Sequence, residues 1–535
     1  MVNFKPLPCL MAAAILVLAQ GVGAVGLPDV PNTHHNPHHK MTPNHTHMGQ
    51  ALTNGRFDFW SRVRFESVED DFPSGHPLAD TNKADMIVLR NALGYTTGRF
   101  HGFYARIEGE VNDVLNSDRA LNLDGDFTTP QFRGETPFGA KLPGAPAGLK
   151  PPAFGPPPHI PAINRHAEGY AIIPDNDFEE INEAYIGWRA PTGGCPSAPG
   201  PCDGPLSFKL GRQTIIYDNH RWVGDVIWRG NNVAMDAFRV DKTLGKLGIS
   251  YAYLDKVKRL FGPDSAFDEW KMDDSHLINI SYKLPQFNGK IVAYGYLLDF
   301  DNNPRTPFVE GTGRAPPFIG PVIFDSETFG VRFKGRHEIS DRLDIQSELE
   351  WANQDPTDDA KHLDDNDYYN IEFGVRFGGT RVDNLGFMPI GEPTYQIRVG
   401  YEVLESNGTN ALQTPLATVH AFNGWADKFV AAPGGSATPL GGIEDTSITL
   451  TVLGLFGNKI GKNKLVINYH DYSTDRSYMS GANRISDYGD EWGILWGKPF
   501  MGKFLFAIKY TDFKSEDGFS TDTEKFWTLL QYRFK

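Results

Sequence analysis

The amino-acid sequence predicts an all-β fold, a single transmembrane antiparallel β-barrel of about eighteen strands with long extracellular loops and short periplasmic turns. Three observations predict it. Apolar and polar residues alternate with period two from about residue 56 to the end of the chain, as in strands whose two faces meet different environments. Many of these segments run roughly ten residues, enough to cross a bilayer at a tilt. Long and short connections alternate, as between the two rims of an outer-membrane barrel.

The composition agrees with this class of protein. The 535 residues include 51 Lys and Arg against 66 Asp and Glu, a net charge of −15, and 12% of the residues are aromatic. An acidic balance argues against a nucleic-acid partner, which needs a basic face for phosphates. No apolar window of about 20 residues follows the N-terminus, which excludes a helical membrane protein.

The first 24 residues have the pattern of a secretory signal peptide. Lys5 supplies the positive start, residues 10–18 the apolar centre, and Val22 and Ala24 the small residues for cleavage after Ala24. A buried N-terminal helix is the alternative. The signal places the mature chain outside the cytoplasm, and with the strand pattern it predicts the outer membrane of a Gram-negative bacterium.

A His-rich segment follows at 25–54. Its clustered imidazoles are able to bind Zn, Cu or Ni ions. The stretch is rich in Pro and Asn and has no apolar face, so we predict a disordered periplasmic segment without a specific metal site.

Cys195 and Cys202 flank a turn rich in Pro and Gly. They are the cysteines left after removal of the signal. In an oxidising compartment this spacing predicts a small-loop disulfide; two free thiols are the alternative.

The barrel is predicted over residues 55–535. Its first strand places Phe57 and Val63 on one face and Arg62 and Arg64 on the other. The same alternation recurs at 103–110, 328–334, 343–351, 369–377, 395–403, 503–510 and 526–534. A soluble barrel would hide the apolar face inside. Strand length, aromatic residues near strand ends and the unequal loops favour a membrane barrel, with apolar faces toward lipid.

The connections predict which rim each strand end reaches. Long ones are expected at about 67–83, 114–178, 213–234, 256–274, 301–325, 405–443 and 473–487. Short ones are expected at 95–98, 241–245, 285–289, 336–341, 457–463 and 498–502, and the connection at 378–394 breaks the alternation. An even number of strands brings both chain ends to the periplasmic rim.

The charged face then lines a lumen wide enough for water. Rings of arginine select anions, although Arg and Glu side chains that pair across strands to stiffen the wall are an equal alternative. The sequence has no Gly-x-Ser-x-Gly, His-Glu-x-x-His or P-loop motif, so we expect no enzyme activity, no cofactor and no metal.

Several segments resemble the alginate export outer-membrane porins, and together they cover most of 55–535. They are Asn91 to Tyr95 with Phe100 to Phe103; Leu210 to Gln213 with Arg221 to Gly224, Trp228-Arg229 and Phe238-Arg239; His420 to Phe429; Tyr469 to Tyr472; Tyr488-Gly489 with Glu491-Trp492; and the closing strand. The resemblance implies an eighteen-stranded barrel whose basic constriction passes an anionic polyuronate outward by diffusion.

The resemblance also implies the site residues. The pore would consist of eight arginines, with two acidic residues to orient them: Arg64, Arg90, Arg106, Arg212, Arg229, Arg239, Arg376, Arg398, Glu183 and Glu402. A loop carrying His420, Trp425, Asp427 and Lys428 would act as a lid, with a rigid external cap as the alternative. The connection between 143 and 158 is unusually rich in proline for this family, and we expect a plug or cover there.

The expected partners are an anionic polysaccharide or oligouronate, outer-membrane lipid and lipopolysaccharide, and periplasmic export proteins. We expect a monomer. The alternative function is a substrate-selective uptake porin for small anions or oligosaccharides. Neighbouring genes for polymer synthesis would favour the first function, and catabolic genes the second.

Overall fold

The computed structural model describes residues 44–71, 83–116, 173, 175, 177–190, 206–226, 228–260, 262–263, 269–300, 325–357, 364–379, 393–429, 438–455, 462–480 and 483–534. The predicted signal peptide, most of the His-rich segment, the proline-rich connection, and Cys195 with Cys202 lie outside these residues.

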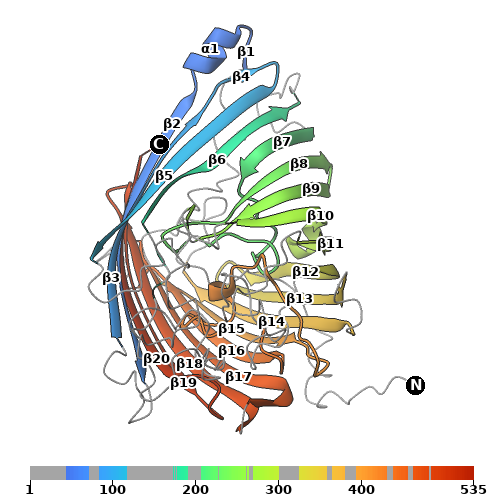
Figure 1. Ribbon diagram of the computed structural model, residues 1–535, viewed down its shortest axis with the longest axis vertical. Coiled ribbons are helices and arrows are strands. Elements are labelled where there is room, and N and C mark those ends of the chain that lie inside the picture. The colour runs from blue at the N-terminus through green and yellow to red at the C-terminus, as the bar shows by residue number, and fades with distance from the viewer. Residues whose placement is uncertain are drawn as a thin grey trace, which may run out of the picture.

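Among the described residues, eighteen long antiparallel strands close into one barrel (Figure 1). The strands are β2 (Arg56–Asp71), β3 (Lys83–Thr96), β5 (Phe103–Asn116), β6 (Phe178–Arg189), β7 (Leu206–Gln213), β8 (Ala234–Leu244), β9 (Leu247–Lys258), β10 (Glu269–Leu284), β11 (Gly289–Leu298), β12 (Ser326–Ser340), β13 (Leu343–Pro356), β14 (Asn366–Gly378), β15 (Thr394–Leu404), β16 (Ile443–Leu453), β17 (Lys464–Ser480), β18 (Asn483–Phe500), β19 (Phe504–Ser515) and β20 (Asp522–Phe534). Each pairs with the next, and β2 closes on β20 with Val63 opposite Leu530. The predicted fold class and strand number are confirmed.

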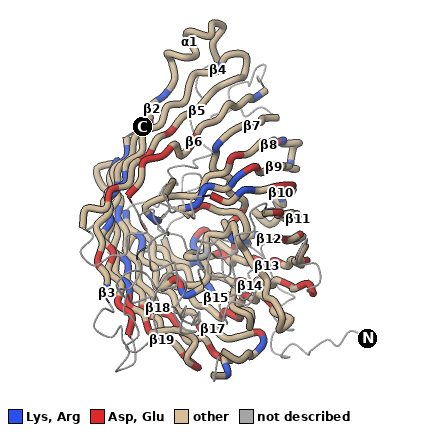
Figure 2. Tube along the Cα trace, in the orientation of Figure 1, with Lys and Arg blue, Asp and Glu red and all other residues tan. Residues whose placement is uncertain are grey.

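The strands of the barrel wall expose their apolar face outward and bury their charged face inside, the reverse of a soluble barrel. On β2, Phe57 is 61% exposed whereas Arg64 is 2% exposed. Outward apolar residues such as Leu93, Phe329 and Val399 continue the pattern around the barrel. Residues of both charge signs are intermixed along the strands (Figure 2). The apolar faces are therefore suited to lipid, and the charged faces line the interior.

Short elements lie at the end of the barrel where the described residues begin. β1 (Asn44–His45) pairs in parallel with β4 (Arg99–Phe100), and α1 (Met48–Thr53) lies between β1 and β2. The Gly98 amide donates to the Ala51 carbonyl at 2.7 Å. Residues 44–53, expected within a disordered segment, thus form defined structure on the β3–β5 turn. No helix among the described residues is long and apolar enough to cross a membrane.

The connections between strands differ in length, as predicted, with one exception. Residues 341–342 join β12 to β13, whereas 405–442 join β15 to β16. The prediction of a long loop at 473–487 is wrong, because β17 and β18 extend through this stretch and are joined across 481–482. Polar residues give this stretch a loop-like composition. Within it Tyr478 and Ile485 are buried, as is Tyr488 directly after it, and the packing of these side chains stabilises the strands.

Candidate functional site

Two connections fold into the barrel rather than over it. We call them inner loop A (described residues 214–226 and 228–233, between β7 and β8) and inner loop B (described residues 405–429 and 438–442, between β15 and β16). Inner loop B includes the 3-10 turn η5 (Val419–Ala421). They bind each other through backbone hydrogen bonds, from the Gly224 amide to the Leu416 carbonyl at 2.9 Å and from the Thr418 amide to the His220 carbonyl at 3.0 Å.

Apolar packing fixes the two loops against one side of the wall. Ile215 and Val223 of inner loop A and Leu412 of inner loop B are fully buried in one cluster with Leu254 and Tyr294 from the strands. The core of this protein therefore lies inside the barrel, between loops and wall. Burying these side chains makes the narrowing of the lumen a stable feature.

On the opposite wall, three buried arginines hold inner loop A by its backbone. Arg90 on β3 donates to the Arg229 carbonyl at 3.2 Å and to Asn232 Oδ1 at 2.8 Å. Arg62 donates to the same carbonyl, and Arg64 donates to the carbonyl of Trp228. Carbonyl groups of a buried loop lack a strand partner, and the guanidinium groups supply the missing donors.

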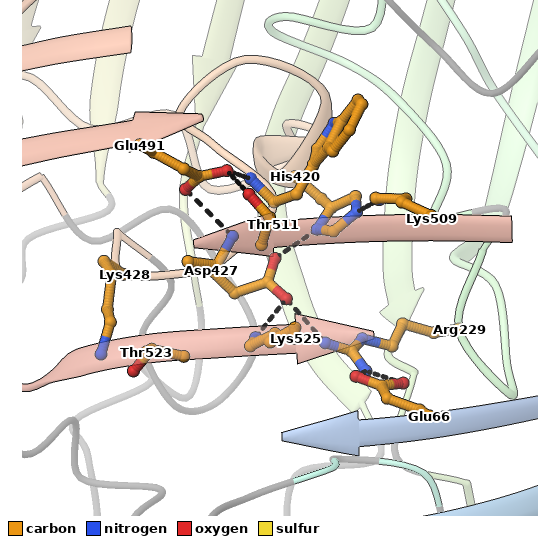
Figure 3. Close-up of polar contacts among 12 residues, drawn as sticks. Glu66, Arg229, His420, Asp427, Lys428, Glu491, Lys509, Thr511, Thr523 and Lys525 are labelled. Carbon is orange, nitrogen blue, oxygen red and sulfur yellow. Dashed lines mark hydrogen bonds and ion pairs between the residues drawn. The ribbon is translucent and has the colours of Figure 1, made fainter. Parts of the chain in front are cut away.

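Arg229 and Asp427 join both inner loops to the wall (Figure 3). Arg229 Nη1 lies 3.0 Å from both carboxylate oxygens of Glu66 on β2, and its Nη2 lies 2.7 Å from Asp427 Oδ2. Asp427 also accepts from Lys525 on β20 at 3.0 Å and from His420 at 2.6 Å. Burial opposes the charged form of Asp427, but His420, Lys525 and Arg229 together hold its pKa well below the usual range.

A lysine on β19 contacts both inner loops as well. The Lys509 amine lies 3.6 Å from the ring centre of Trp228, 4.4 Å from that of Trp425 and 4.5 Å from that of Trp527. It also contacts His420 Nε2. Burial lowers the pKa of His420 well below its usual value, against the opposing effect of Asp427. The lysine charge is stabilised by three aromatic faces.

The remaining part of the lid motif is also buried. Glu491 on β18 accepts from the amides of Trp425 and Ala426 and from Thr511 Oγ1. Lys428 lies 3.7 Å from Asp70, and burial lowers the pKa of its amine to about 8. His420, Trp425, Asp427 and Lys428 thus lie together inside the barrel, not in an external cap.

The two predicted acidic residues pair with arginines. Glu183 binds Arg106, which also donates to Asp58 at 2.8 Å. Glu402 lies 2.8 Å from Arg221 Nε of inner loop A. Arg221 belongs to a motif quoted above but was not among the predicted pore residues.

Three predicted arginines are partly exposed to the lumen. Arg239 pairs with Asp241 at 2.8 Å, Arg398 with Glu372 at 2.9 Å, and Arg376 with Asp344. Their side chains are 19%, 11% and 24% exposed, respectively, whereas Arg64, Arg90, Arg106 and Arg229 are almost fully buried.

Arg212 lies elsewhere than predicted. It is on the face of β7 that carries the exposed Leu210, and it pairs with Asp236 at 2.8 Å. It therefore belongs to the outer surface, because Gln213 and Lys209 occupy the inward positions of this strand. The alternation of Leu206, Phe208 and Leu210 with Ser207 and Lys209 already places position 212 on the apolar face, so the wrong placement came from the motif resemblance and not from the strand pattern.

An open pocket lies in the lumen beside inner loop B. Its empty space, which continues into open solvent, is about 600 Å³, and it is lined by Arg398, Glu372, Asn468 and His470 from the strands and by Phe422 of the loop. Asn468 is buried, and its Oδ1 has no hydrogen-bond partner among the residues that the structure describes. Polar donors and acceptors therefore face a space that is open to water. The described residues hold no group of three or more His, Cys, Asp or Glu side chains placed to bind a metal.

Sequence reasoning missed several residues of the constriction. Glu66, Lys509 and Lys525 lie on inward faces of their strands, so the period-two pattern marks them as lumen residues without singling them out. Asp175, which contacts Arg64, carries no signal in the sequence.

No family model matches the chain, and no curated protein matches it. Solved structures do. The outer membrane protein OpdK from Pseudomonas aeruginosa matches with a TM-score of 0.55 at 9% identity, covering 90% of this chain and 99% of that chain. OpdK solved with vanillate matches at 0.56 and 11% identity, with the same coverage.

Two further solved structures extend the comparison. OccD3 of Pseudomonas aeruginosa matches at 0.55 and 11% identity, covering 96% of this chain and 99% of that chain. OccAB4 of Acinetobacter baumannii matches at 0.55 and 10% identity, covering 90% and 98%. The chain has the fold of these outer-membrane barrels. At such identities the likeness is one of fold, and the predicted outer-membrane location agrees with it.

Proposed function

We propose that this protein is an outer-membrane channel that takes up small anionic solutes selectively, by diffusion and without covalent chemistry. The observation that carries the proposal is the pair of inner loops, which meet inside a barrel whose inward face is charged. Lipid and lipopolysaccharide would surround its apolar outer face.

The inner loops favour a small solute over a polymer. Their contacts are buried and numerous, so the narrowing persists without a ligand. A polymer with a carboxylate on every sugar unit would need a continuous basic path, but four of the predicted pore arginines are almost fully buried and bound to carboxylates or loop carbonyls of the chain.

The partly exposed arginines favour an anion. A guanidinium has five N–H donors, and one carboxylate leaves some of them for a solute at Arg239 and Arg376. Paired arginines bind a passing carboxylate weakly, which suits conduction, because a solute must leave as well as enter. Vanillate, present in an OpdK structure, is an aromatic carboxylate of this kind.

Export of a polyuronate, with periplasmic partner proteins, is the second candidate. The observation that favours it is that the His420–Phe429 motif and Arg229 lie together at the constriction, as the sequence resemblance implies. It requires the inner loops to move aside.

Planar-bilayer recording of the refolded chain tests both candidates. We expect anion-selective reversal potentials and millimolar block by benzoate, with little block by long oligouronates. Arg398→Gln should weaken the benzoate block several-fold, whereas Arg212→Gln, on the outer face, should leave it unchanged. Block by oligouronates at lower concentrations than benzoate would favour export instead. Cation selectivity with no block by either would overturn both.

A further inference from the structure

The carboxylate of Asp175 occupies a site that is built like a carboxylate receptor. Its Oδ2 binds Arg64 Nη2 and lies 3.8 Å from Arg229 Nη1, and its Oδ1 accepts from the Gly230 amide. Two guanidinium groups and a backbone N–H recognise a carboxylate whatever it is attached to. We call these three donors the cradle.

The cradle depends on a glycine. A Cβ at Gly230 would stand 2.7 Å from Asp175 Oδ1 and 2.8 Å from Asn112 Nδ2, closer than such atoms approach. The backbone of inner loop A therefore comes near enough to bind a carboxylate because position 230 has no side chain. A methyl group at this position would fill the space that a carboxylate oxygen needs.

The charge around the cradle attracts an anion. Arg62 and Arg90 lie beside Arg64 and Arg229, and all four are buried. Glu66, Glu110, Asp225 and Asp427 supply nearby negative charge, and Lys525 pairs with Asp427. These five cations face five carboxylates when Asp175 is included, so the loss of its charge would leave one buried cation unmatched, and an anion from solution would be drawn in.

Asp175 is held near the cradle by its neighbours rather than by a strand. Ile173 packs in an apolar cluster with Val68, Met86 and Val88, and β6 begins at Phe178. The carboxylate is thus tethered at the wall. Tethering gives it an effective concentration in the millimolar range, which a solute at similar concentration is able to match.

We propose that Asp175 is an internal substitute for a solute carboxylate, and that small carboxylates bind the cradle by displacing it. This inference rests on the proposed uptake of small anions and deepens it, because it assigns a specific binding site and its built-in competitor. The described contacts of Asp175 then set the concentration at which a solute binds.

The main test removes the competitor. Asp175→Asn should lower the dissociation constant for benzoate about tenfold, as expected if the carboxylate fills the cradle about nine-tenths of the time. Titration calorimetry on the refolded protein in detergent measures this without requiring conduction. Asp58→Asn is the control, because it removes a buried lumen carboxylate that pairs with Arg106 and lies six residues along β2 from Arg64, away from the cradle.

A second substitution locates the new affinity. Adding Gly230→Ala to Asp175→Asn should return benzoate binding to the wild-type level or below, because the Cβ occupies the cradle. Asp175→Glu should stay near wild type. A heat-dependent shift on electrophoresis verifies that each variant has folded as a barrel.

The outcomes test the cradle as a binding site separately from the proposed channel function. Equal gains from Asp175→Asn and Asp58→Asn, or a gain that survives Gly230→Ala, would overturn the cradle. A failure of Asp175→Asn to gain affinity would do the same. If Asp175→Asn gains affinity while the wild-type barrel conducts no anions, the cradle stands and the proposed function fails.

Discussion

The side chain of Lys509, on β19 of the barrel wall, contacts both inner loops. Its amine is surrounded by Trp228 from inner loop A, Trp425 from inner loop B and Trp527 from β20. A buried cation with three aromatic faces is stabilised by about 1–2 kcal/mol. The strand pattern places Lys509 in the lumen, and the aromatic neighbours give it a positioning role.

Lys509→Met should loosen the inner loops while it keeps the length of the side chain. A loss of about 1–2 kcal/mol changes the ratio of closed to open arrangements by roughly 5- to 30-fold. We expect larger and noisier single-channel currents and a red-shifted tryptophan fluorescence. Lys503→Met, beside Phe534 at the short-turn rim, is the control. Currents identical to wild type would contradict this role.

His220 predicts a pH dependence of the inner loops. Burial lowers the pKa of His220 to about 4 from 6.5, so the folded arrangement excludes a proton that a detached loop would bind. The free energy that holds inner loop A in place is therefore undiminished above pH 6.5, and it falls as the pH drops from 6.5 toward 4. Protease cleavage within inner loop A should therefore accelerate below about pH 6, and His220→Gln should reduce this dependence. A rate that does not change between pH 7 and pH 4 would contradict it.

At the scale of elements, inner loop B is held by β17 and β18 as well as by its own turns. The Tyr488 hydroxyl donates to the Gly442 carbonyl at 2.8 Å, and the Ser406 amide donates to Asp475 at 3.0 Å. Both partners come from the long hairpin that replaced the predicted 473–487 loop. The hairpin therefore supports the constriction from the side of the long loops.

Gly424 is the position where inner loop B comes nearest to β18. Its φ is +86°, and a Cβ there would lie 2.3 Å from Glu491 Oε2. Gly424→Ala should displace the loop and raise the open-channel current, at a cost of about 1–3 kcal/mol from backbone strain plus the clash. Gly245 has φ +60° with open space around it. Gly245→Ala therefore measures the effect of backbone strain without a clash. If both variants conduct alike, the close approach is not what seats the loop.

At the scale of the whole molecule, the barrel depends on its outer apolar surface meeting lipid. Leu349 lies on the outward face near the middle of β13 and is 41% exposed. Leu349→Arg should destabilise the barrel in vesicles by about 2–4 kcal/mol, measured by the urea midpoint of folding. Leu349→Phe should change it little. If the arginine variant is as stable as wild type, Leu349 does not face the hydrocarbon.

The amino-acid sequence by itself determined the wall of this protein. Alternation along segments such as 56–65 predicts both the strand and the composition of its two faces, because strand geometry is local. The fold class and the eighteen strands follow from that pattern and were confirmed. The extended hairpin at 473–487 was missed because its stability comes from buried Tyr478 and Tyr488, not from local alternation.

Only the tertiary structure decided what the charged residues do. Arg64 and Arg398 have the same sequence signal, yet Arg64 holds inner loop A and Asp175, whereas Arg398 faces a pocket. Arg229 and Asp427 stand 198 positions apart and form one ion pair. Such pairings depend on where loops of more than about ten residues fold, and loop paths are set by long-range packing that no local period encodes.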